Sequence, residues 1–173
     1  MPNGLIVGCE SLFVAYSPRQ AGTLFAFAAA GMLTGDTLAG RLVPAHWRDR
    51  LGPWLRPLLA GPYLIFAARP ALALARTACA VASVGYSATL MLQQRLMDLT
   101  PDELTGHALG LHSSGMLAMQ GVGAALAGAI AGLTSAGAAM TLMAAASITV
   151  TLALAPGLRP AAGHSSTPAR EVT

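Results

Sequence analysis

A long apolar run covers residues 108–131, which read ALGLHSSGMLAMQGVGAALAGAIA. It contains no Asp, Glu, Lys or Arg, and a helix of about 20 apolar residues is long enough to cross a lipid bilayer. A second run, residues 136–155, follows a turn that we predict at Thr134 and Ser135. Two such runs in succession indicate an all-α membrane protein.

The composition of the whole chain supports this interpretation. The 173 residues are 54% hydrophobic and only 10% charged, whereas a soluble domain carries about 25% charged residues. A soluble domain of this size must cover a large surface with polar groups, so that class is excluded. The basic residues are all Arg and lie mostly between apolar segments, which favours a role in membrane orientation over nucleic-acid binding.

Before residue 108 the chain is more polar. Residues 95–107 read RLMDLTPDELTGH, and we predict a helix start within them. Thr100 is the expected N-cap, Pro101 belongs to the first turn, and the acids that follow lie near the positive end of the helix dipole.

Three more spans are expected further toward the N-terminus. Residues 21–43 are apolar, with Asp36 near their far end. Residues 53–68 are short and proline-rich, which indicates a kinked span, and residues 71–94 carry Arg76 in their first turns. With the two runs above and the first segment, this makes a bundle of about six transmembrane helices.

The first segment, residues 4–16, is apolar but only 13 residues long, which is too short to span comfortably. It is either a re-entrant or interfacial piece, or the second part of a truncated helix whose beginning is missing from the chain. After Pro156 the sequence becomes polar and rich in Pro, Ser and Thr. We therefore expect a bundle over residues 1–158 and a disordered cytoplasmic tail over residues 159–173.

Three stretches of the chain resemble the C-terminal half, helices seven to twelve, of a major facilitator superfamily transporter. Residues 31–44, GMLTGDTLAGRLVP, are similar to the family's glycine–acid–arginine signature at the cytoplasmic end of the eighth helix. Residues 100–110, TPDELTGHALG, are similar to the loop before the eleventh helix, with His107 in place of the commoner Arg. Residues 3–10, NGLIVGCE, are similar to the interior of the seventh helix.

This resemblance implies a gating motif and a transport function. The motif consists of Gly31, Gly35, Asp36, Gly40 and Arg41, in which the acid and the arginine latch neighbouring helices in one transport state. The alternative for Asp36 is a solvated acid at a helix end.

Glycines four residues apart permit close helix crossings. Gly31 and Gly35 form such a pair, and so do two further pairs: Gly106 with Gly110, and Gly128 with Gly132. Each pair is also compatible with ordinary small residues in an alanine-rich helix.

Glu10 is the first candidate for a substrate or proton pathway, because an ionisable residue in an apolar segment usually faces a cavity. The alternative is an interfacial acid bonded to a neighbouring helix. Secondary candidates are Arg76, Gln93, His112 and Gln120. Cys9 and Cys79 stand alone in apolar runs, so we expect small buried side chains and no metal site or cofactor.

Arginine positions predict the orientation in the cell membrane. More Arg residues fall in the 41–56 segment, the 95–107 segment and the C-terminus than in the opposite loops, which places those three in the cytoplasm.

The expected function is transport, most simply efflux of a small molecule with proton coupling as one option, and no enzymatic activity is expected. A half of this kind has one wall of a midplane site and is expected to be inactive alone. It would pair with an N-terminal six-helix half or with a second copy. The alternative is a non-transporting membrane protein that binds another helix bundle.

Overall fold

The computed structural model describes residues 2–42, 44, 55 and 57–154, and within them it is entirely helical. The expected all-α class is therefore confirmed for the described residues. The helices are α1 (Pro2–Ser11), α2 (Phe13–Tyr16), α3 (Ala21–Thr37), the π-helix η1 (Leu38–Leu42), the 3₁₀ helix η2 (Gly61–Ala68), α5 (Leu72–Val84), α6 (Ser87–Asp98), α7 (Asp102–Leu133) and α8 (Ala136–Leu154).

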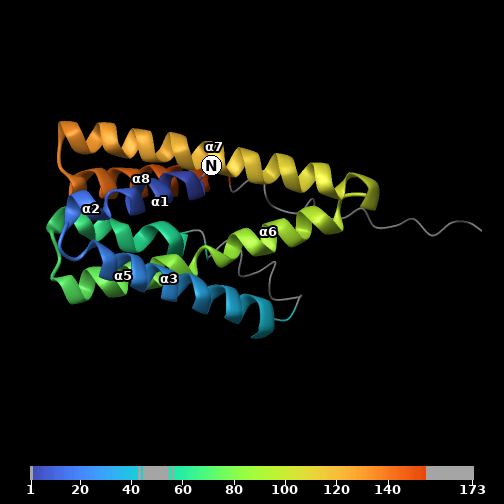
Figure 1. Cartoon of the computed structure of the whole chain (residues 1–173), viewed down its shortest axis with the longest axis horizontal. Helices are drawn as coiled ribbons and strands as arrows, with labels where there is room; N and C mark the ends of the chain where they lie inside the picture. The colour runs from blue at the N-terminus through green and yellow to red at the C-terminus, as the bar shows by residue number, and fades with distance from the viewer. Residues whose placement is uncertain (1, 43, 45–54, 56, 155–173) are drawn as a thin grey trace, which may run out of the picture.

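The helices run back and forth along the long axis of the molecule (Figure 1). Helix α1 packs against α7 and α8, and α3 packs against α5. Helix η2 contacts both α8 and α5 and so joins the two groups. Short connections around Ser17, Arg69 and Ser135 meet at one end, where they line a common cavity.

The number of continuous spans differs from the expectation of about six. Among the described residues, α7 and α8 alone are both long and apolar enough to cross a bilayer as single helices. The remaining segments are interrupted: α1 gives way to α2 at Leu12, and α5 gives way to α6 at Gly85 and Tyr86. α3 passes into a π-helix at Leu38.

The third predicted span contains a change of helix type. Residues 57–60 are α-helical and continue as the 3₁₀ helix η2. Two proline rings, Pro57 and Pro62, remove backbone donors from this segment, which explains why it is not a regular α-helix.

The boundaries of α7 are close to those predicted. The helix begins at Asp102 with both acids in its first turn, and it ends at Leu133 before the predicted turn. The assignment of Thr100 as N-cap was wrong, and so was the placement of Pro101 in the first turn. Pro101 is itself the N-cap, while the Thr100 hydroxyl donates to the Leu96 carbonyl oxygen at 2.6 Å and belongs to the end of α6.

The core lies between the two helix groups and is rich in aromatic rings. Phe13 packs edge-on against Phe25, with ring centroids 5.0 Å apart, and Tyr63 lies 5.5 Å from Phe66. Cys9 and Cys79 are both free and buried, as predicted. The Cys9 thiol donates to the Met140 carbonyl oxygen at 3.3 Å and helps to attach α1 to α8.

Of the three glycine pairs singled out in the sequence, one makes a close crossing within this chain. A Cβ atom on Gly31 would overlap the Ala80 carbonyl oxygen, and one on Gly35 would lie 2.6 Å from the Val84 carbonyl oxygen. The other two pairs were predicted wrongly as crossings within the bundle. A Cβ on Gly106, Gly110, Gly128 or Gly132 would meet nothing within 4 Å among the described atoms.

A second close crossing was not predicted. Gly4 and Gly8 on α1 face Gly123 on α7, so that a Cβ on Gly123 would overlap the Gly4 carbonyl oxygen. A Cβ on Gly8 would lie 2.6 Å from the Gly123 carbonyl oxygen. The two backbones touch here without side chains between them, which fixes the position of α1 in the bundle.

The predicted tail over residues 159–173 and most of the 44–52 loop lie outside the described residues.

Candidate functional site

Glu10 lies near the end of α1 and is half-buried, with its Oε1 atom enclosed by the protein. Its carboxylate interacts with the hydroxyl groups of Tyr63 on η2 and Tyr86 at the break between α5 and α6. Ser83 lies one turn before this break and is fully buried. We call Glu10, Tyr63 and Tyr86 the Glu10 cluster, and Ser83 is a separate buried hydroxyl near it in the sequence.

The polar groups of this cluster are incompletely paired. Glu10 Oε1, Tyr63 OH and Tyr86 OH are buried and make no hydrogen bond of good geometry with the described residues. A buried polar group left unpaired costs about 1–3 kcal/mol, and a charged group costs more. Such a cluster is therefore unfavourable for stability, and this is characteristic of sites retained for a function.

Two local features bring these residues together. Gly85 allows a close approach of the preceding proline-rich segment, since a Cβ at this position would lie 2.7 Å from Leu59 Cα. The chain turns there, and Tyr86 follows with its hydroxyl toward Glu10. On α1, the Ser11 hydroxyl donates to the Gly8 carbonyl oxygen at 2.8 Å, just before the helix ends.

His112 lies elsewhere, on the wall of a cavity of about 460 Å³. The cavity is bounded by α1, Leu59, Gly85 at the break before α6, α6 itself, α7 and the end of α8, and its walls are mainly apolar. Asn3 Nδ2 donates to Thr89 Oγ1 at 2.9 Å across it. His112 Nε2 is buried and has no hydrogen-bond partner among the described residues.

The structure gives Arg76 a different role from the predicted one. Its Nε donates to Thr23 Oγ1 at 3.1 Å, and its guanidinium also donates to Gln20 Oε1 at 3.0 Å. The guanidinium carbon lies 6.0 Å from the centre of the Phe27 ring. Arg76 therefore attaches α5 to the start of α3, outside the Glu10 cluster.

Replacing Arg76 by leucine is expected to lower the free energy of unfolding by about 1–3 kcal/mol, because it leaves the two acceptors on α3 without their donor. Denaturant titration of the purified chain in detergent micelles measures this change. Arg76→Lys, which keeps the charge but not the forked geometry, should recover part of the loss. If Arg76→Leu left stability unchanged, the attachment of α5 to α3 would not depend on these contacts.

The remaining pathway candidates are not brought into the site. Gln93 on α6 and Gln120 on α7 are half-buried, and neither lines the His112 cavity or belongs to the Glu10 cluster. Asp36 is half-buried in the last turn of α3, and Arg41 is exposed on η1. Within the described part of the chain, no ion pair joins these two charges, so the latch stays a prediction.

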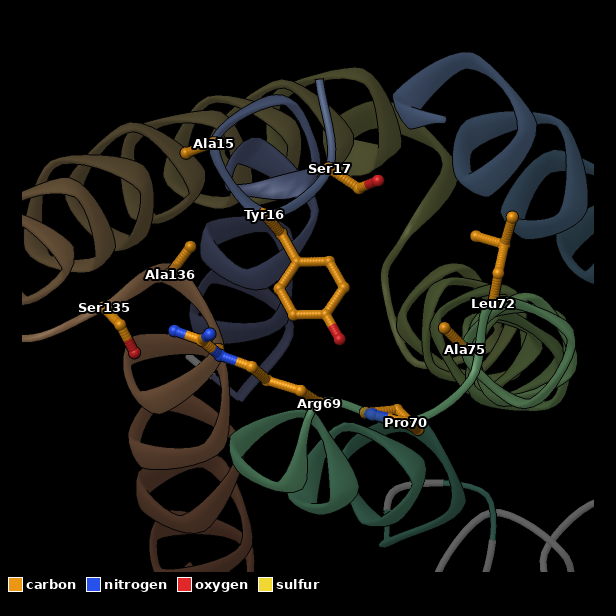
Figure 2. A pocket seen from close by; sticks show the side chains of 10 residues that line it. Ala15, Tyr16, Ser17, Arg69, Pro70, Leu72, Ala75, Ser135 and Ala136 are labelled. Atoms are coloured by element: carbon orange, nitrogen blue, oxygen red, sulfur yellow. The ribbon is translucent and has the colours of Figure 1, made fainter. Parts of the chain in front are cut away.

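The common cavity at the short connections has a volume of about 480 Å³ (Figure 2). Tyr16 points its hydroxyl into this space, and Arg69 extends along one side of it toward Ser135. Arg69 adopts a left-handed backbone conformation, with φ 49°, at the end of η2. This cavity lies at the opposite end of the bundle from the end of α8.

Sequence reasoning pointed to Glu10 and His112 but not to their surroundings. Tyr63, Tyr86, Asn3 and Thr89 come from segments far apart in the chain. The one available signal for Tyr86 was the preceding Gly85, which marks a break or a close approach in a helical pattern.

No protein-family model, curated protein or solved structure matches this chain. The case for a function is carried by the Glu10 cluster and the His112 cavity, together with the many leucines of α7 that are exposed on its surface.

Proposed function

We propose that this chain is one six-helix bundle of a membrane transporter of the major facilitator type, with Glu10 on the substrate or proton pathway. The observation that carries the proposal is the Glu10 cluster, a carboxylate whose Oε1 atom is buried beside incompletely paired hydroxyls in a bundle with many exposed apolar side chains. Inside a membrane protein, an acid in this position is expensive and usually serves transport of an ion or substrate.

The outer surface supports a lipid environment. In the most apolar part of α7 only 11% of the residues are buried. Leu111 is 78% exposed, Leu117 64% and Leu133 87%. A core helix of a soluble protein would be mostly buried, and exposed apolar patches of this extent are rare on soluble monomers. Lipid or another helix bundle is the environment that suits this surface.

The interrupted helices are compatible with six membrane crossings. Broken helices are tolerated at membrane depth where their backbone is enclosed by protein, and transporters place their binding sites at such breaks. Here the break at Gly85 and Tyr86 lies against the Glu10 cluster. In this proposal six segments each cross the membrane once. Four of them contain an interruption, namely α1 with α2, α3 with η1, residues 55–68, and α5 with α6, and the other two are the continuous helices α7 and α8.

The proposal includes the orientation predicted from arginine. The short connections around Ser17, Arg69 and Ser135 would face away from the cytoplasm, and the turn between α6 and α7 would face it. Efflux of a small molecule, driven by protons in the simplest scheme, is the transport mode that we propose.

Alone, the chain is expected not to transport, because alternating access needs a second bundle to move against. We expect cells that lack their own drug pumps and express only this chain to export ethidium no faster than cells carrying an empty vector. Immunodetection of the chain in the membrane fraction is the control. Clear energy-dependent export by the chain alone would contradict the half-transporter proposal in this form.

A non-transporting interaction protein is the second candidate. The observation that favours it is the open glycine surface of α7, where a Cβ on any of six glycines would meet no described atom within 4 Å. Affinity capture of the chain from native membranes separates the two candidates. A six-helix partner or a second copy supports the transporter, and an unrelated membrane protein supports the interaction protein.

A further inference from the structure

The cavity at the short connections combines one cation with several hydroxyl groups. It has a volume of about 480 Å³ and opens to the surface of the molecule. Arg69 supplies the cation, and Tyr16, Ser17 and Ser135 supply the hydroxyl groups, while the described lining residues include no Asp or Glu. We call this space the Arg69 cavity. An anion that enters it would meet hydrogen-bond donors and no opposing negative charge.

Backbone contacts hold Arg69 in place at the end of η2. Its N–H donates to the Phe66 carbonyl oxygen at 3.1 Å, and its φ of 49° is uncommon for a residue with a side chain. Phe66 lies against the start of α8, since a Cβ on Gly137 would lie 2.6 Å from the Phe66 carbonyl oxygen. This contact places Arg69 beside the start of α8, and its side chain extends toward Ser135 (Figure 2).

Two hydroxyl groups at the same cavity can donate hydrogen bonds. Tyr16 points its hydroxyl into the space, and its ring packs edge-on against Phe66 with the centroids 5.2 Å apart. Ser135 Oγ accepts a hydrogen bond from the Ala138 N–H at 3.2 Å, which leaves its own proton for another acceptor. A guanidinium group together with two hydroxyls suits the oxygens of a phosphate group.

The whole end of the bundle that contains the Arg69 cavity carries positive charge. Its connections, with the first two turns of α3 and α5, hold Arg19, Arg69 and Arg76 and none of the described acids. Arg76 is hydrogen-bonded to α3, whereas no described carboxylate pairs with Arg69. Four described acids lie instead toward the opposite end (Figure 1), namely Asp36, Asp98, Asp102 and Glu103. The field of the molecule therefore favours an anion at this end.

Exposed apolar side chains flank the residues that line the Arg69 cavity. Val14, Leu74 and Leu133 each lie within two residues of a lining residue, on α2, α5 and α7. Their side chains are 56%, 54% and 87% exposed. A phospholipid presents the matching chemistry in one molecule, an anionic phosphate joined to apolar chains, so it suits this surface better than a free anion.

We propose that the Arg69 cavity binds the phosphate group of an anionic phospholipid, with the Arg69 guanidinium and the hydroxyls of Tyr16 and Ser135 as donors. The inference goes beyond the proposed function, because it concerns lipid binding by this chain and needs neither transport nor a second bundle. Inorganic phosphate carries the same oxygen chemistry without the apolar chains, and it is therefore the competitor that separates the two sources of the group.

Native mass spectrometry of the purified chain in a neutral detergent measures this binding directly. The chain is titrated with phosphatidylglycerol and, in parallel, with phosphatidylcholine of the same acyl chains, in which a choline cation cancels the phosphate charge. We expect phosphatidylglycerol to bind several-fold more tightly than phosphatidylcholine, because the end of the bundle is positive. Equal affinities for the two lipids would overturn the inference.

Arg69→Asn removes the cation and keeps the backbone, because asparagine tolerates the left-handed conformation. It should weaken phosphatidylglycerol binding about tenfold, the effect of losing a hydrogen bond to a charged group. Arg69→Lys keeps the charge without the forked geometry and should lose less affinity. Arg19→Asn is the matched control, because it removes the same charge from an exposed arginine that does not line the cavity. Equal losses in Arg19→Asn and Arg69→Asn would refute the cavity as the site.

Tyr16→Phe tests the hydroxyl groups separately from the charge. It removes one donor and keeps the aromatic ring against Phe66. Phosphatidylglycerol affinity should fall about threefold, as expected for one neutral hydrogen bond, while phosphatidylcholine affinity should stay the same. An unchanged affinity for phosphatidylglycerol would exclude Tyr16 from the site.

Excess inorganic phosphate distinguishes a lipid headgroup from a free anion. We expect phosphatidylglycerol to stay bound, because its acyl chains also contact the apolar surface. Displacement of the lipid by inorganic phosphate would assign the cavity to a free phosphate ion and refute lipid binding. The proposed function is tested apart from these results, since a chain that transports nothing with any partner can still bind lipid here, and lipid binding does not establish a transporter.

Discussion

Gly123→Leu is expected to separate α1 from α7 and to lower the free energy of unfolding by about 3 kcal/mol or more. The backbones of Gly4 and Gly123 are in contact, so no rotamer of an added side chain avoids the overlap. The carbonyl oxygen lies on a helix backbone and cannot move as the end of a flexible side chain can. The crossing must open, and Cys9 on α1 loses its position against α8.

Thiol exposure provides the measurement. Cys9 and Cys79 are buried, so a thiol-reactive fluorophore reports unfolding during a titration with sodium dodecyl sulfate in mixed micelles. Gly128→Leu is the matched control, because it makes the same substitution on the same helix at a position with open space around it. It should keep or raise stability, since leucine favours a helix over glycine by about 0.8–1 kcal/mol. Equal losses in the two variants would refute the crossing at Gly123.

The glycine pairs show what sequence spacing can and cannot predict. Gly31 with Gly35 and Gly128 with Gly132 have the same spacing, which places each pair on one face of a helix. Only the first pair has another helix against it in this chain. Spacing identifies a face, but the partner of that face depends on how distant segments pack. The contact of Gly123 with Gly4 was not predicted, because it joins two distant helices and does not require a second glycine four residues from Gly123 on α7.

Segment boundaries were more predictable than segment continuity. The start of α7 and the turn before α8 follow from local signals, namely a proline with two acids and a polar pair between apolar runs. The break between α5 and α6 has one weak local signal, Gly85, within a pattern that is otherwise apolar. It depends on the close approach of Leu59 from another segment. Hydropathy measures composition, so it did not separate a broken span from a continuous one.

The Glu10 cluster has the same dependence on distant packing. An acid in an apolar segment was visible in the sequence and was expected to face a cavity, but Glu10 lines neither of the two cavities described above. Its surroundings, Tyr63 and Tyr86, come from two segments that the sequence linked to no site. Arg76 was visible for the same reason as Glu10, yet it is satisfied by Gln20 and Thr23. A charge in an apolar segment therefore predicts that polar groups lie beside it. For Arg76 these are the ordinary hydrogen-bond acceptors of Gln20 and Thr23, and for Glu10 they are the incompletely paired hydroxyls of Tyr63 and Tyr86.

Glu10→Leu is expected to raise the stability of the chain and to abolish transport by the complex that the chain forms with its partner. The carboxylate has no cationic partner among the described residues, and its neighbouring hydroxyls are incompletely paired. An acidic side chain near the middle of a membrane helix costs about 2.5–3.5 kcal/mol relative to an apolar environment. Leucine removes this cost but leaves Tyr63 and Tyr86 unpaired, so a net gain of about 1–2 kcal/mol is the expected result.

Two measurements on the same variants decide the role of Glu10. Stability is measured by the titration described for Gly123, and transport is measured as export by the complex captured from native membranes and reconstituted in vesicles. Glu10→Gln keeps the shape and removes the charge, so it should lose transport about tenfold or more without the stability gain of leucine. A carboxylate that only holds helices together predicts the reverse, because Glu10→Leu would then destabilise the bundle by leaving the two tyrosines without their partner. Greater stability combined with lost transport is the result that identifies Glu10 as a pathway residue, since a purely structural group cannot produce both effects.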